Sequence, residues 1–307
     1  MIFKSITKRK IQVVLGVLWL IDGFLQLQHQ MFTVNFARTV IDGAATGQPL
    51  IVAGPIHIAV HLITAHPAIY DTIFILIQLL IGILILNKKT VRQGLILSCL
   101  WGVGVWYFGE GMGGILSGNT NLIMGAPGAV IIYVILALAV MPNSKEDQTK
   151  THPAFWLPIF WGLFWIGGAI YQLLPGQNSA SDLASMLNIN SVYAPHYLAS
   201  LDNWSARQVT LYGFKFIWIL ALVEFLIGVF IFMPKPYKQV SLLLGSILAI
   251  VFWVLGQSLG GYFTGLMTDP NSGPLFVILA ITILGCPILK NQTLFKRSWV
   301  SLEKFIT

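Results

Sequence analysis

The sequence predicts an all-α membrane protein with eight transmembrane helices, arranged as two parallel four-helix repeats with both termini in the cytoplasm. Three observations predict this fold class. The 307-residue chain is 56% hydrophobic and only 9% charged, whereas soluble domains carry about 25% charged residues. Its basic residues gather between alternate apolar segments, and the second half of the chain repeats the pattern of the first.

Eight apolar segments are each about as long as the hydrocarbon core of a bilayer requires of a helix. They are residues 11–28, 68–86, 93–114, 125–141, 155–173, 209–233, 239–261 and 274–289. The basic start before the first segment also resembles a signal peptide, but no small-residue cleavage site follows it. We therefore expect the first segment to remain as a membrane helix.

The placement of charge predicts the orientation. Of the 18 Lys and Arg residues, all but three fall on one side of an even-numbered topology, the exceptions being Arg38, Arg207 and Lys215. Because basic residues are retained in the cytoplasm, both termini are expected there, and the long loops 29–67 and 174–208 outside. The net charge of +7 thus reports orientation in a membrane, which we expect to be a bacterial plasma membrane, rather than a nucleic-acid partner.

Self-comparison of the sequence predicts the duplication. Trp19 and Gln26 recur 146 residues later as Trp165 and Gln172, and after one inserted residue Trp106 recurs as Trp253. Each repeat holds an even number of spans, so both halves insert the same way up. The predicted domains are residues 1–141, a polar cytoplasmic linker at 142–153, and residues 154–307.

The two outer loops are too long for simple connections and are expected to fold. Residues 51–65 have helical spacing and are expected to lie in the membrane interface. His57 and His61 are four residues apart and share one helical face, a spacing that suits a metal ion. No partner for them appears in the second half, so ordinary histidines on an interfacial helix are favoured and no metal site is predicted.

Residues 106–114, WYFGEGMGG, place one carboxylate among four glycines and return as residues 253–261, WVLGQSLGG. Glu110 is expected either at the mouth of an outward-facing cavity or as an outer carboxylate beside a glycine seam that packs helices. Ionisable groups inside a span are costly and therefore suggest function. Asp22 and Glu224 are two such groups, and for each a purely structural role in packing is the alternative.

Matched positions of the two repeats pair a carboxylate with an amide: Glu110 with Gln257, and Glu224 with Gln78. This asymmetry suits one ligand with two different ends. The candidate ligand-binding residues, expected to face one internal cavity open to the outside, are Asp22, Gln26, Trp106, Glu110, Gln172, Glu224, Trp253 and Gln257. No catalytic residues are predicted, and the cofactor is left unknown.

Two segments that follow the outer loops resemble the DoxX-like family of four-span membrane proteins. Residues 78–92, QLLIGILILNKKTVR, and 224–238, EFLIGVFIFMPKPYK, resemble the family's E-x-x-x-G-x-x-x-x-x-G-x-x-T-R segment; Glu224 keeps its glutamate and Gln78 departs from it. The family includes a subunit of a thiosulfate:quinone oxidoreductase and components of membrane thiol-redox assemblies. A thiol-redox role is not supported by Cys99 and Cys286, which stand singly without a CxxC pair.

The leading functional expectation is a tandem DoxX-like protein that binds a small amphipathic ligand, a quinone or lipid-like molecule, as an accessory to a membrane redox or envelope process. Two alternatives stay open. One is a transporter for a small solute or a proton-coupled substrate, in which Glu224 or Asp22 titrates. The other is a scaffold that holds a partner membrane or exported protein on its two outer loops.

Overall fold

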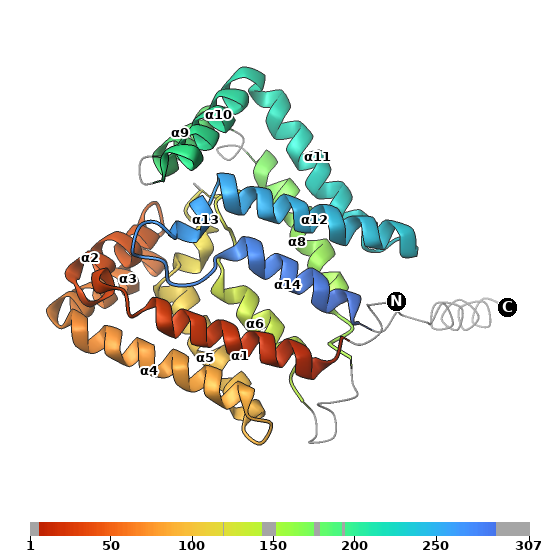
Figure 1. Ribbon diagram of the computed structural model, residues 1–307. Coiled ribbons are helices and arrows are strands. Elements are labelled where there is room, and N and C mark those ends of the chain that lie inside the picture. Colours follow the sequence, from red (N-terminus) through yellow and green to blue (C-terminus); the bar gives the residue numbers. More distant parts are fainter. Residues whose placement is uncertain (1–5, 119, 143–151, 175–178, 192–193, 287–307) are drawn as a thin grey trace.

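The computed structural model describes residues 6–118, 120–142, 152–174, 179–191 and 194–286, and every regular element within them is a helix (Figure 1). The prediction of an all-helical chain is therefore confirmed for these residues. The linker predicted at 142–153 falls, except for its ends, outside the described residues, as does the basic segment 287–307.

Four helices of the first half form one packed group. α1 (Lys8–Leu25) lies along α4 (Pro67–Leu86), while α5 (Val91–Phe108) contacts both α4 and α6 (Val130–Ala139). Glycines allow the first of these contacts: a Cβ added to Gly82 would lie 2.8 Å from the carbonyl oxygen of Gly16. Such close backbone approach at small residues is typical of helices that pack within membranes.

The second half forms a similar group. α8 (Leu157–Leu173) lies along α11 (Phe214–Phe230), while α12 (Lys235–Leu255) contacts both α11 and α14 (Ser272–Leu284). Here a Cβ added to Gly228 would lie 2.8 Å from the carbonyl oxygen of Gly162. The two groups meet where α6 contacts α14, near the middle of the molecule in Figure 1.

Both long loops are folded, as expected. The first contains the helix predicted at 51–65, which runs as α3 (Leu50–Ala65) and buries Ile56 against Met31 and Phe36 in a small core of its own. Before it come four short helical turns, η2 (His29–Phe32), α2 (Val34–Phe36), η3 (Ala37–Ile41) and η4 (Asp42–Ala45). The second loop contains α9 (Ala180–Ser191) and α10 (His196–Tyr212), which pack on each other.

Several helices end earlier than the apolar segments predicted. α5 stops at Phe108 and α12 at Leu255, and each is followed by a short turn, η5 (Gly111–Gly114) or α13 (Ser258–Gly261). The backbone in these turns is left-handed, with φ of +57° at Met112 and +56° at Leu259. A right-handed helix cannot continue through such residues. The segments predicted at 93–114 and 239–261 are therefore helix followed by a reversal of the chain.

The described residues contain two helices that are both long and apolar enough to cross a membrane, α4 and α12. A third is added if α10 and α11 count as one span, although their axes are bent by 104° at Gly213. α4 turns its apolar side outward and buries Asp71 and Gln78; its exposed stripe is Ile69, Ile73, Leu76, Leu80 and Ile83. This arrangement is the one a surrounding bilayer requires.

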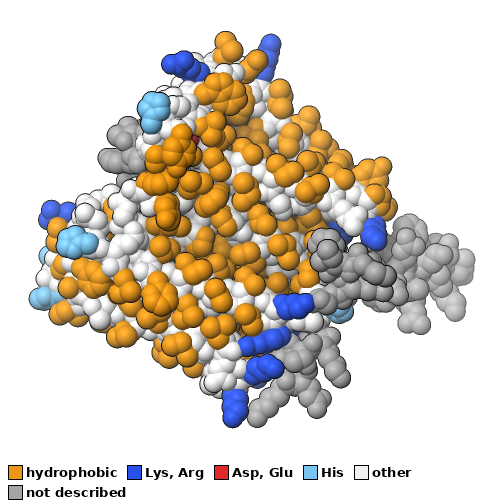
Figure 2. Space-filling view, in the orientation of Figure 1, with side chains coloured by type: hydrophobic (Ala, Val, Ile, Leu, Met, Phe, Trp, Pro, Cys, Tyr) orange, Lys and Arg blue, Asp and Glu red, His pale blue; other side chains and the backbone are white. Residues whose placement is uncertain are grey.

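The surface agrees with a membrane setting. Figure 2 shows hydrophobic side chains spread over the visible face of the bundle, with Lys and Arg gathered at its ends. Two basic residues at the N-terminal end also hold the bundle together. Lys8 donates to the carbonyl oxygen of Met141 at 3.2 Å, and Arg9 donates to Ile85 O at 3.0 Å at the end of α4. These contacts fix the end of the bundle opposite to α3.

Candidate ligand-binding site

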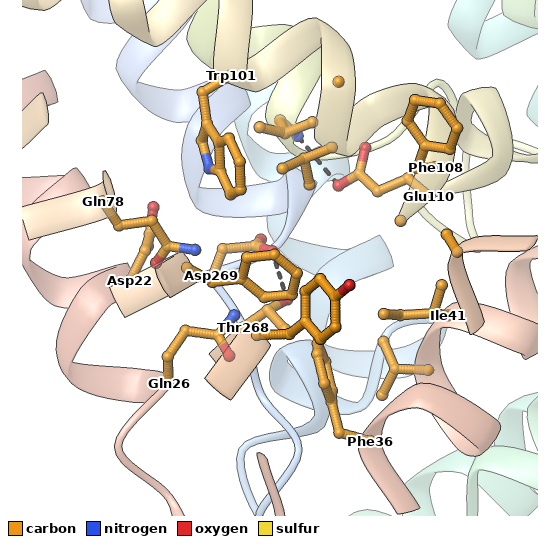
Figure 3. Close-up of a pocket in the computed structure, with 18 of the residues that line it drawn as sticks. Asp22, Gln26, Phe36, Ile41, Gln78, Trp101, Phe108, Glu110, Thr268 and Asp269 are labelled. Carbon is orange, nitrogen blue, oxygen red and sulfur yellow. Dashed lines mark hydrogen bonds between the residues drawn. The ribbon is translucent and has the colours of Figure 1, made fainter. Parts of the chain in front are cut away.

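A cavity of about 510 Å³ lies within the first half of the chain, between α1, α3, α4, α5 and α6 (Figure 3). Its volume is in the range of pockets that hold small molecules. Aromatic and aliphatic side chains make most of its wall: Trp19, Phe36, Ile41, Tyr70, Phe74, Trp101, Phe108 and Tyr133. Its polar lining consists of Asp22, Gln26, Gln78, Glu110, Thr268 and Asp269.

Asp22 is fixed on the α1 side of the cavity by a chain of buried contacts. Its Oδ1 accepts a hydrogen bond of 3.1 Å from the Tyr133 hydroxyl. The Tyr133 ring meets the Trp19 ring edge-on at 4.9 Å between centroids, and the Trp19 indole donates to Ser98 Oγ at 2.8 Å. Because each side chain holds the next, the Asp22 carboxylate has one defined position.

Glu110 comes to the cavity through the chain reversal that follows α5. Its Oε1 accepts the backbone N–H groups of Ala129 at 3.0 Å and Val130 at 3.1 Å, so it caps the N-terminus of α6. The reversal depends on glycine. A Cβ on Gly113, where φ is +63°, would lie 2.0 Å from the carbonyl of Pro127.

The other oxygen of the same carboxylate lies beside the backbone of Gly128. Glu110 Oε2 is buried and has no hydrogen-bond partner. Trp106, one turn earlier on α5, does not line the cavity; its indole donates to Pro127 O at 2.7 Å and so supports the reversal. Glu110 therefore joins the end of α5 to α6 and also lines the cavity.

Two glutamines extend the polar part of the lining. Gln26 on α1 is 3% exposed and Gln78 on α4 is 6% exposed, and the Oε1 atom of each is buried without a hydrogen-bond partner. A buried acceptor without a donor costs about 1–3 kcal/mol. These side chains are therefore suited to a ligand that offers hydrogen bonds.

Asp269 reaches the cavity from the second half of the chain, in the connection between α13 and α14. It accepts hydrogen bonds from the Thr268 hydroxyl at 2.8 Å and from Asn271 N at 2.7 Å. Burial raises the pKa of Asp269 above its ordinary value, and these two hydrogen bonds lower it in part. In the view of Figure 3 it lies between Asp22 and Glu110, and it interacts electrostatically with both.

Sequence reasoning missed Asp269. The matching position in the first half, 147 residues earlier, is Leu122, so the repeat gave no signal. The residue also sits in a turn-like run, DPNSG, that predicts a simple connection. The only available signal was an acidic residue next to a predicted span.

The structure brings three of the eight predicted residues to this cavity: Asp22, Gln26 and Glu110. The expectation of one cavity lined equally by both halves thus differs from the structure, because the second-half candidates Gln172, Glu224, Trp253 and Gln257 do not line it. Glu224 is fully buried in α11, and both of its oxygens lack a hydrogen-bond partner. Gln172 and Trp253 are similarly placed, with buried side-chain polar atoms that have no partner.

Gln257 has a structural role that parallels Glu110. Its Oε1 accepts from the Ser272 hydroxyl at 3.2 Å at the start of α14, and its Nε2 donates to Ile123 O at 3.4 Å. The void beside it, against Trp165 and Phe276, measures about 10 Å³, which is room for no more than one water molecule. This side chain joins the end of α12 to α14 and to the first half.

The histidines of α3, His57 and His61, are exposed. His57 Nδ1 lies 2.9 Å from Asp42 Oδ1 on the exposed surface. Among the described residues, no group of three or more His, Cys, Asp or Glu side chains is arranged to hold a metal ion.

Comparison with known proteins returned no match among protein-family models, curated proteins or solved structures.

Proposed function

We propose that this chain is an integral membrane protein that binds a small amphipathic molecule in the first-half cavity. The observation that carries the proposal is a cavity whose wall is mostly apolar and holds a few polar side chains, Asp22, Gln26, Gln78, Glu110, Thr268 and Asp269. A pocket that is mostly apolar and has a few convergent polar groups is the usual form of a small-molecule site. An amphipathic ligand matches both parts.

Eight membrane spans in two parallel repeats are part of this proposal. The eight helices α1, α4, α5, α6, α8, α11, α12 and α14 fall on the eight apolar segments. The duplication is supported by backbone detail. Left-handed φ angles occur at Gly113 and Gly118 and again, 147 residues later, at Gly260 and Gly265. The Gly16–Gly82 contact likewise has its counterpart, 146 residues on, in Gly162–Gly228.

The ligand enters from the outer side in this proposal. α3 and η3, which form part of the cavity wall, belong to the loop 29–67, which the distribution of basic residues places outside. The DoxX-like resemblance of residues 78–92 and 224–238 adds a membrane redox or envelope process as the setting. The protein then acts as the ligand-binding accessory of that process.

Proton-coupled transport is a second candidate, and one observation favours it. Glu224 lies within α11 with 0% of its surface exposed, and neither oxygen has a hydrogen-bond partner. Such a carboxylate is costly unless it binds a proton. If it carries protons, liposomes containing the wild-type protein should acidify faster under an imposed proton gradient than liposomes containing Glu224→Gln. Equal rates, read with an internal pH-sensitive dye, would rule this candidate out.

The binding proposal is tested by filling the cavity. Gly104 lines the cavity, and a Cβ added there meets no atom within 4 Å. Gly104→Phe should therefore occupy the site without disturbing the helices. Gly167 on α8 is the matched control, because its Cβ also meets no atom within 4 Å and its surface is exposed away from the cavity.

Three proteins are expressed in the same host and purified in the same way: the wild-type protein, Gly104→Phe and Gly167→Phe. The small molecules bound to each are identified by mass spectrometry after denaturation. We expect a compound present in stoichiometric amount in the wild-type and Gly167→Phe proteins and absent from Gly104→Phe. The same compounds at the same level in all three would contradict the proposal.

A further inference from the structure

The charge that lines the first-half cavity has a single sign. Among the described residues that line it, every charged side chain is a carboxylate: Asp22, Glu110 and Asp269. The three come from α1, from the reversal after α5 and from the connection before α14, so they surround the space rather than sharing one element. This inference rests on the proposed function and narrows the class of ligand.

Each carboxylate already has part of its hydrogen bonding satisfied by the protein. Tyr133 donates to Asp22, the first turn of α6 donates to Glu110, and Thr268 with Asn271 donates to Asp269. None of these donors is a cation. Buried carboxylates are ordinarily paired with a positive charge, and among the described residues no cationic side chain lines the cavity beside these three. The cavity therefore lacks a positive charge.

The buried glutamines leave this conclusion unchanged. The amide oxygens of Gln26 and Gln78 and Oε2 of Glu110 have no donor, but the protein encloses all three atoms. The Trp101 indole N–H is likewise buried without a partner. An amide can turn to present either its oxygen or its NH₂ group, so the glutamines can bind a donor or an acceptor. Only the carboxylates distinguish between ligands that donate hydrogen bonds and ligands that accept them. They select a ligand that donates hydrogen bonds.

The missing positive charge is not that of a bound metal ion. Within the part of the chain that the structure describes, no three carboxylate, histidine or cysteine side chains are close enough to coordinate one ion. Most of the wall is apolar and offers few oxygen ligands. Aromatic faces do attract organic cations.

We propose that the cavity binds an organic cation, a protonated amine carried on an aromatic or aliphatic body. The ammonium group lies beside Asp269, between Asp22 and Glu110, and donates to the carboxylate oxygens within its reach. The body of the ligand packs against Phe74, Trp101 and their aromatic neighbours. A quinone fits this lining less well, because both of its oxygens are acceptors and would face carboxylates.

The test compares three probes of nearly equal shape: 4-phenylbutylamine, 4-phenylbutanol and 4-phenylbutanoate. Their binding to the full-length protein in nanodiscs at pH 7 is measured by isothermal titration calorimetry. Gly104→Phe nanodiscs provide the blank, because they report partition into the lipid alone. We expect the amine to bind at least about tenfold more tightly than the alcohol, as charge-assisted hydrogen bonds are the stronger ones, and the carboxylate not to bind.

A second measurement locates the charge preference. Asp269→Asn keeps the size of the side chain and the acceptor for Asn271 N, and the Thr268 hydroxyl can turn to accept from the new amide. Because the variant removes the charge, it should weaken binding of the amine about tenfold and leave the alcohol unchanged. A folded Asp269→Asn protein is verified by its elution as a single species. Equal loss for amine and alcohol in this variant would contradict the proposal.

The outcomes separate this inference from the function on which it rests. If the alcohol or the carboxylate binds as tightly as the amine, and Gly104→Phe abolishes that binding, the cation preference is wrong and the ligand site stands. If no probe binds the wild-type protein more tightly than it binds Gly104→Phe, both the ligand site and its preference for a cation are wrong.

Discussion

Glu110 caps the helix that begins at Val130: its Oε1 accepts the backbone N–H of Val130 at 3.1 Å. One carboxylate therefore performs two tasks, since its Oε1 holds α6 in place and its Oε2 stays buried and unpartnered in a residue that lines the cavity. Glu110→Ala removes the cap and should lower the free energy of unfolding by about 1–2 kcal/mol. Glu110→Gln retains an acceptor and should lose less.

Both variants are compared with the wild-type protein by titration with sodium dodecyl sulfate in mixed micelles, following helicity by circular dichroism. If Glu110→Gln and Glu110→Ala were destabilised equally, the capping role of Oε1 would be wrong. The charge, rather than the acceptor, would then be the stabilising feature.

The hydrogen bond from Tyr133 to Asp22 is buried. Tyr133→Phe should lower the free energy of unfolding by about 1–3 kcal/mol, because it leaves the carboxylate without its donor. Tyr107→Phe is a suitable control: its hydroxyl donates to Ile51 O at 2.6 Å on the exposed surface, where water can replace the lost bond. The change in the free energy of unfolding of both variants is measured in the same detergent titration. An equal decrease for Tyr107→Phe and Tyr133→Phe would show that burial does not make the Tyr133 hydrogen bond more important.

Gly113 should tolerate no side chain. Its φ of +63° disfavours L-residues, and an added Cβ would lie 2.0 Å from the Pro127 backbone. We expect Gly113→Ala to abolish the monodisperse peak in size-exclusion chromatography. Gly104→Ala, in a helix with open space at its Cβ, should be as stable as the wild-type protein or up to about 1 kcal/mol more stable. A monodisperse, equally stable Gly113→Ala protein would show that the reversal after α5 differs from the one described.

Asp269 predicts a pH dependence of stability. Burial raises its pKa above the ordinary value of 3.8, so the folded state binds this proton more tightly than the unfolded state. Its contribution to stability is complete below the ordinary pKa and is lost as the pH rises through the raised pKa. The unfolding midpoint of the ligand-free protein should therefore fall as pH increases from about 4 towards 7.

A comparison with Asp269→Asn isolates the contribution of the Asp269 carboxyl group. Asp22 and Glu110 interact electrostatically with Asp269 and can contribute slopes of their own. The quantity to compare is thus the difference between the wild-type protein and Asp269→Asn, measured by thermal unfolding across the same pH series. The variant should show the shallower fall. Identical slopes would mean that Asp269 has the same proton affinity in the folded and unfolded states.

Much of the helical layout could be predicted because apolar length and charge placement determine where a membrane helix can lie. The ends of α5 and α12 could not, since the left-handed backbone after them includes Met112 and Leu259, residue types that seldom adopt it. Their left-handed conformation depends on the glycines around them and on the tertiary contacts of the turn.

The site was predicted only in part, and the reason is physical. Asp22 and Gln26 share one face of α1, and helical spacing alone places them together. Asp269 joins them because the connection before α14 crosses to the first half, a tertiary arrangement that repeat matching cannot reveal. Glu224 was predicted as a ligand-binding residue because a charge buried in a membrane helix is costly. It is buried as expected, but α11 does not reach this cavity.

The most direct test of the ligand site is photoaffinity labelling. A 4-phenylbutylamine derivative that carries a diazirine on its ring is irradiated with the nanodisc-embedded wild-type protein, and the labelled residues are mapped by peptide mass spectrometry. We predict labels on the cavity walls of α4 and α5, at Phe74, Trp101 and Phe108, and their loss in Gly104→Phe. Labels confined to α8, α11 and α12, unchanged in that variant, would contradict a binding site in the first half of the chain.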